Sequence, residues 1–222
     1  MEYAALFFIL ILLLFFLSRV LTSEIYSFFY KTTRSENFSI GILSAVLFIG
    51  VFGHEMAHFL TAKFLLVPTG KVSLFPKKDG DYLKLGSVSV AQSNILKEFI
   101  IGVAPLVVGI ISILLLVYFM IQDLSGFNFL KIILSLMGIF VISNTMYASR
   151  RDFQAALPFL VAVITLGFVL IILNIRFPIV TISFLPAIDF SRIFYMGSIY
   201  LGIPVVIDLS IIIIFRIFNR MW

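Results

Sequence analysis

Charged residues, cysteine and histidine are all scarce in this sequence of 222 residues. Only 12% of the residues are charged and 62% are apolar, with a mean hydropathy of +1.18. A soluble domain carries about twice that charged fraction, so the composition is typical of a membrane protein instead. The absence of cysteine excludes disulfide bonds and thiolate metal ligands. The two histidines are therefore the only candidates for nitrogen ligands of a metal ion.

The net charge of +5 comes from basic residues that are scattered along polar segments without interleaved aromatic residues. Nucleic-acid surfaces concentrate such residues, so we expect no nucleic-acid partner. A positive-inside distribution explains the charges better. Placing the N-terminus in the cytoplasm leaves most Lys and Arg residues on that side. The bias predicts that both termini are cytoplasmic and that the number of spans is even.

Six apolar stretches approach the length of about 20 residues that a membrane-spanning helix needs. They are Ala4–Leu21, Ser39–Leu66, Phe99–Ile121, Phe129–Met146, Phe153–Leu173 and Ile193–Phe215. We interpret the first as a retained membrane anchor. The sequence therefore predicts an all-α membrane protein of about six transmembrane helices. It predicts one membrane-embedded domain over residues 1–222.

One polar segment, Val67–Asn94, separates the second apolar stretch from the third. Within it, Lys71–Phe75 and Tyr82–Val90 alternate apolar and polar residues, and Asp79-Gly80 is a strong turn signal. The pattern predicts a small β-hairpin or sheet, inserted between helices 2 and 3 at about residues 67–94. An ordinary connecting loop is the alternative.

Both histidines lie in the segment His54-Glu-Met-Ala-His58, inside the second apolar stretch. Residues i and i+4 are neighbours on a helix, so the two imidazoles can bind one metal ion. Zinc suits histidine ligands and lowers the pKa of a bound water to about 7. Glu55 is placed to act as general base toward such a water. Ionisable residues at membrane depth are costly and usually functional; a structural polar cluster is the alternative.

A zinc ion held by two histidines needs a third protein ligand, which must here be an oxygen ligand. The acidic residues near apolar stretches are Glu98, Asp152, Asp189 and Asp208. Glu98 also suits an interfacial position, and Asp189 suits a helix cap. Asp208 lies deep in the last stretch, where Arg192, Arg216 or a hydroxyl is an alternative partner.

Three segments resemble the site-2 proteases, a family of intramembrane zinc metalloproteases. They are His54–His58, Gly102-Val-Ala-Pro105 and Asn144–Asp152. The third is similar to the family's Asn-x-x-Pro-(x)4-Asp-Gly segment, whose aspartate is the third zinc ligand. The resemblance covers about residues 39–157. It implies that Asp152 joins His54 and His58 as a ligand of Zn2+, and that Asn144 helps to position the substrate.

The chain departs from the family pattern at Tyr147, where proline is usual, and at Phe153-Gln154, which replace the glycine after the aspartate. Ala57 replaces a common glycine. The chain resembles a minimal member without appended regulatory modules. The implied function is hydrolysis of a peptide bond in or next to a transmembrane segment of another protein within the lipid bilayer. The β insertion is a candidate for pairing with the unwound substrate.

Two other classes fit part of the pattern. A transporter or metal-binding membrane protein would use the histidines and an aspartate as a transport site, with further polar residues along a path through several helices. An inactive membrane scaffold would not need Glu55 between the ligands. The oligomeric state is left open by the sequence.

Overall fold

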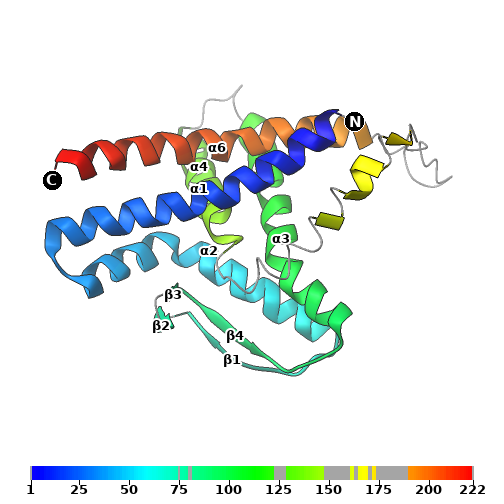
Figure 1. Ribbon diagram of the computed structural model, residues 1–222, viewed down its shortest axis with the longest axis horizontal. Helices are drawn as coiled ribbons and strands as arrows, with labels where there is room; N and C mark the ends of the chain where they lie inside the picture. The colour runs from blue at the N-terminus through cyan, green and yellow to red at the C-terminus, as the bar shows by residue number, and fades with distance from the viewer. Residues whose placement is uncertain are drawn as a thin grey trace.

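The chain forms long helices and two small sheets in the computed structural model, which describes residues 2–74, 76–79, 82–122, 129–147, 161–162, 165–169, 172–173 and 190–221. The helices are α1 (Glu2–Thr33), α2 (Glu36–Phe64), α3 (Ile95–Gln122), α4 (Phe129–Thr145) and α6 (Phe190–Met221). Figure 1 shows α1 between α6 and α2, with α3 and α4 running steeply across them. Buried apolar side chains from these helices form one core cluster.

Four helices are long and apolar enough to cross a membrane, judged by length and composition. They are Tyr3–Thr33, Glu36–Phe64, Ile95–Met120 and Ser191–Arg220. α4 is also apolar but has only 17 residues. Six spans were predicted, and most of the predicted fifth span, Phe153–Leu173, lies outside the described residues. Large apolar side chains such as Ile49 (76% exposed) and Leu60 (61% exposed) face outward, as expected for helices that contact lipid.

The ends of α2 follow from local capping. Ser35 precedes the helix, and its hydroxyl accepts a hydrogen bond from the Phe38 N–H at 3.3 Å. After the last turn, Leu66 adopts a positive φ of 56°. The Val67 N–H then donates to the Ala62 carbonyl at 2.8 Å. This turn directs the chain out of α2 and into the strands.

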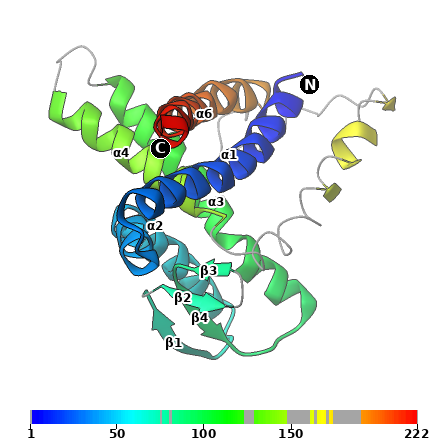
Figure 2. The ribbon, with the colours of Figure 1, turned by 60° about the vertical axis from the view of Figure 1, so that its left-hand side comes forward.

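The strands are β1 (Thr69–Ser73), β2 (Lys77–Asp79), β3 (Tyr82–Lys84) and β4 (Ser87–Val90), and they follow α2 in the chain. β1 pairs antiparallel with β4, with Val72 opposite Val88, and β2 pairs antiparallel with β3. The predicted turn residue Gly80 lies outside the described residues. Both sheets lie on the side of α2 that faces away from α1 and α6 (Figures 1 and 2).

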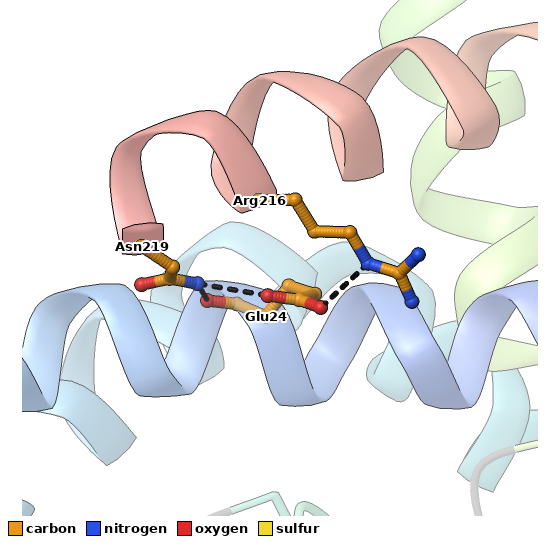
Figure 3. Close-up of polar contacts among 3 residues, drawn as sticks. All are labelled: Glu24, Arg216 and Asn219. Carbon is orange, nitrogen blue, oxygen red and sulfur yellow. Dashed lines mark hydrogen bonds and ion pairs between the residues drawn. The ribbon is translucent and has the colours of Figure 1, made fainter. Parts of the chain in front are cut away.

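α1 and α6 lie side by side and run in the same direction (Figure 1). Near their N-terminal ends, the rings of Tyr3 and Tyr195 meet edge to face with centroids 4.8 Å apart. Near their C-terminal ends, Arg216 Nε lies 2.9 Å from Glu24 Oε1. Asn219 Nδ2 donates to Glu24 Oε2 at 2.8 Å (Figure 3). These contacts fix the parallel register of the two helices.

This parallel pair places the N-terminus and the C-terminus at opposite ends of the molecule (Figure 1). The prediction that both termini are cytoplasmic requires antiparallel first and last spans, which differs from this pair. The side of the membrane on which each terminus lies stays a prediction. α4 crosses α1 steeply (Figures 1 and 2), and its end meets α1 where Ser18 contacts Asn144 and Tyr147 contacts Ile11. The charge bias counts basic residues on each side of the membrane and contains no information on helix packing.

Candidate metal centre

The two histidines of α2 turn their rings toward each other across one helical turn. His54 Nε2 lies 3.2 Å from His58 Nε2, and the ring planes are 83° apart. Two Zn–N bonds of about 2.05 Å at a tetrahedral angle separate the nitrogens by about 3.3 Å. The observed spacing therefore fits two ligands of one tetrahedral ion. A hydrogen bond between the two neutral rings would give a similar distance, and metal analysis distinguishes the two cases.

The orientation of His58 is set by the backbone of α3. Its Nδ1 lies 2.8 Å from the carbonyl oxygen of Ile101. Because a carbonyl only accepts hydrogen bonds, this contact requires a proton on Nδ1 when the ring is neutral, which leaves the Nε2 lone pair for a metal. A carbonyl partner on the second ring nitrogen is typical of histidine ligands. Both histidines are buried, with 4% of His54 and 9% of His58 exposed.

Glu55 is enclosed by the chain that connects β3 to β4. Its side chain is 5% exposed, and Gly86 is also buried. A Cβ added to Gly86 would lie 2.8 Å from Glu55 Oε1 and 2.7 Å from Val51 Cγ1. A close approach of this kind requires glycine, whose missing side chain leaves room for the carboxylate. The backbone at Gly86 thus lies directly against the predicted general base.

The described residues contain no group of three or more His, Asp or Glu side chains placed to hold a metal. Glu98 lies instead in the first turn of α3, where its carboxylate accepts a hydrogen bond from the Ser93 N–H at 3.0 Å. Asp208 lies beside Asn144. Asp152, the third ligand implied by the family resemblance, and Asp189, the predicted cap, lie outside the described residues.

Asn144 is buried where α4 meets α1 and α6. Its Nδ2 donates to Asp208 Oδ1 at 2.7 Å and to the Phe140 carbonyl at 2.9 Å. Its own carbonyl accepts a hydrogen bond from Ser18 Oγ at 3.0 Å. Asp208 is fully buried and Asn144 is 5% exposed. The family resemblance gives Asn144 a role in positioning substrate, yet here its amide nitrogen is engaged between two helices.

Tyr147, which stands where the resembled family has proline, holds the end of α4 against α1. Its hydroxyl donates to the Ile11 carbonyl at 2.9 Å, and its ring meets Phe15 edge to face with centroids 5.3 Å apart. Proline could supply neither contact.

The two residues between Asn144 and Tyr147 contact the remaining helices. A Cβ on Gly50 of α2 would overlap Thr145 Oγ1, and one on Gly109 of α3 would lie 2.7 Å from Met146 Cβ. We call Asn144–Tyr147 the junction, because its residues contact α1, α2, α3 and α6. Gly50 lies one turn before His54, so the junction is adjacent to the part of α2 that carries the two histidines.

The partners of the junction were not identified from the sequence. Arg192, Arg216 or a hydroxyl was considered as the partner of Asp208, whereas the structure gives it Asn144, and Arg216 bonds Glu24. A usable signal was present: both Asn144 and Asp208 are polar residues in apolar helices, and such residues commonly pair with one another.

Comparisons of the chain with family models, with curated proteins and with solved structures found no match. The resemblance to site-2 proteases therefore depends on the three sequence segments themselves.

Proposed function

We propose that this protein is an intramembrane zinc metalloprotease that hydrolyses peptide bonds in or next to transmembrane segments of membrane-anchored proteins. The observation that carries the proposal is the 3.2 Å spacing of the His54 and His58 Nε2 atoms, with Glu55 beside them on a helix of membrane-spanning length. Asp152 completes the ligand set by family resemblance. The chemistry of this donor set fits Zn2+.

Each residue of the centre has a separate task. Zinc, when bound, supplies Lewis-acid activation of water and of the scissile carbonyl. Glu55 accepts the proton of the attacking water and transfers it to the departing amine nitrogen. The Ile101 carbonyl keeps His58 in the tautomer that presents Nε2. Burial of the centre limits competing water, which strengthens the electrostatic interactions among these groups.

The sheet beside α2 supports a substrate-binding role for the β insertion. A helical substrate must unwind locally, because its carbonyls are engaged in its own hydrogen bonds. Within the described residues, β1 and β4 each pair with one strand only, so each has an edge to which an extended segment can add. The chain between β3 and β4 lies against Glu55 at Gly86. A substrate strand added to this sheet would therefore pass near the general base.

The test of this function combines metal analysis with cleavage. Purified protein should contain about one zinc per chain and cleave a model membrane-spanning substrate in lipid vesicles. A chelator should abolish cleavage, and added zinc should restore it. A zinc-containing protein that does not hydrolyse peptide bonds would favour a transporter or a metal-binding scaffold. A protein that binds no zinc would exclude the proposed centre.

The membrane topology is a further part of the proposal. We place the N-terminus in the cytoplasm from the charge bias, and the C-terminus on the other side from the parallel α1 and α6. The chain has no cysteine, so a single cysteine can be added at either terminus and labelled from outside intact cells. Only the C-terminal cysteine should react. Labelling of both or of neither would contradict a parallel pair of spanning helices.

A further inference from the structure

We propose that Asp208 is a positioning residue for the metal centre, which acts by holding Asn144 and thereby keeping the junction against the helix that carries His54 and His58. The inference rests on the proposed function, because it takes His54 and His58 as zinc ligands. Asp208 would contact neither zinc nor substrate. Its contribution is the hydrogen bond that its carboxylate accepts from Asn144 across α4 and α6.

The contact between Asp208 and Asn144 is short and shielded. The Nδ2···Oδ1 distance is 2.7 Å, Asp208 is 0% exposed and Asn144 is 5% exposed. Within the described part of the chain, Asp208 Oδ2 and Asn144 Oδ1 have no hydrogen-bond partner. The Nδ2···Oδ1 bond is thus the polar interaction that ties this carboxylate to α4. A buried carboxyl group in an apolar helix is expected to depend strongly on such a bond.

The position of Asn144 explains how the effect would reach the metal. Asn144 begins the junction, and the next residue, Thr145, packs on Gly50, one turn before His54 on α2. The junction is therefore in contact with the helix of the two histidines. A hydrogen bond that holds Asn144 also holds this contact in place.

Two simpler roles fit the structure less well. Asp208 is not grouped with two other His, Asp or Glu side chains in a metal-binding arrangement among the described residues, which argues against its being a ligand. Asn144 is buried and donates to Asp208 and to the Phe140 carbonyl, so its amide nitrogen is not directed toward a substrate. An interhelical hydrogen bond that supports the junction beside the histidine pair accounts for both residues.

The first experiment measures zinc affinity by competition with a chelator. Loss of a residue that supports a metal ligand typically weakens affinity by about 10–100-fold, so Asp208→Ala should bind zinc at least about tenfold more weakly. Asp208→Asn should stay near the wild-type affinity, because its amide oxygen can still accept from Asn144. Ser198→Ala is the matched control, since Ser198 is also a buried polar residue of α6 but bonds Tyr3 and Phe194.

The same measurement on Asn144→Ala tests whether the two residues act together. Asn144→Ala removes the donor of the hydrogen bond to Asp208. It therefore also tests the inference if Asp208→Ala fails to fold. The double variant should bind zinc no more weakly than the weaker single variant, because both substitutions break one contact. Additive losses would overturn the inference. So would an Asp208→Ala variant that binds zinc like Ser198→Ala, or an Asp208→Asn variant that binds as weakly as Asp208→Ala.

Cleavage kinetics at saturating zinc distinguish positioning of the metal from contact with the substrate. Under these conditions Asp208→Ala and Asn144→Ala should recover most of kcat, with the KM for substrate unchanged. A raised KM in Asn144→Ala at full zinc occupancy would assign Asn144 to the substrate and overturn the inference. Wild-type protein that binds no zinc would overturn the proposed function as well, whereas normal zinc binding and cleavage in Asp208→Ala would overturn this inference alone.

Discussion

The histidine pair on α2 and the junction at the end of α4 are both buried and polar, yet they are built from different parts of the chain. His54 and His58 are four residues apart on one helix. The junction instead joins residues that are distant in sequence: Asn144 and Asp208 are 64 positions apart, and Tyr147 and Ile11 are 136 positions apart.

The two regions should therefore respond differently to substitution. The histidine pair needs only a helix to bring its nitrogens together, so substitutions there should remove a ligand and leave the packing of the helices nearly intact. The junction exists only when α1, α2, α3 and α6 have all docked against α4. Substitutions there should change stability and reach the chemistry indirectly. Each prediction below tests one side of this contrast.

The largest effect is expected for His58→Ala. Alanine keeps α2 helical, but the variant loses a zinc ligand and the contact with the Ile101 carbonyl. Zinc content should fall to near zero and cleavage should be lost, while circular dichroism retains the helical signal. Met56→Ala, between the ligands on the same helix, is the control and should keep its zinc. Full zinc occupancy in His58→Ala would show that the pair does not hold the metal.

A smaller effect is expected for Gly86→Ala. The new Cβ would lie 2.8 Å from Glu55 Oε1 and 2.7 Å from Val51 Cγ1, so the strand connection or the carboxylate must move. A displacement of about 1 Å can lower catalysis by about 10²-fold, and we expect a loss of that order with zinc content unchanged. Gly53→Ala is the control, since its Cβ meets nothing within 4 Å. Equal cleavage rates in the two variants would remove Gly86 from the active site.

The smallest effect is expected for Tyr147→Phe. The substitution removes one buried hydrogen bond, to the Ile11 carbonyl, and keeps the ring contact with Phe15. The free energy of unfolding should fall by about 1 kcal/mol, measured by reversible denaturation in detergent, with the zinc content unchanged. Tyr118→Phe, at a residue that is 49% exposed, should have no such effect. If Tyr147→Phe lost its zinc instead, the junction would belong to the chemistry directly.

What the sequence predicted correctly is local. The spacing of four residues placed the two imidazoles side by side, and the alternation of apolar and polar residues marked the segments that form β1, β3 and β4. Hydropathy identified the long helices α1, α2, α3 and α6, because the apolar run is itself the property that a spanning helix requires. The roles of His54, Glu55, His58 and Asp152 in catalysis and zinc binding stay predictions.

What the sequence did not predict depends on contacts between distant segments. The parallel pairing of α1 and α6 is fixed by Glu24 with Arg216 and Asn219, and nothing in either helix alone indicates its partner. The sequence marked Asp208 and Asn144 as polar residues in apolar helices, but several other polar residues were equally possible partners, so it did not show that these two bond each other. Tyr147 was noted as a departure from the family pattern, but its role became clear only from its contact with Ile11.

The most direct test of the account is the Glu55→Gln variant, analysed for zinc content and for cleavage of a membrane-spanning substrate in the same preparation. Glutamine keeps the shape of the side chain beneath Gly86 but cannot accept a proton from water. We expect zinc to stay at about one ion per chain while the cleavage rate falls by about 10²–10⁴-fold, the usual contribution of a general base. Cleavage at the wild-type rate, or loss of zinc from the variant, would contradict the assignment of Glu55 as the base beside a zinc ion held by His54 and His58.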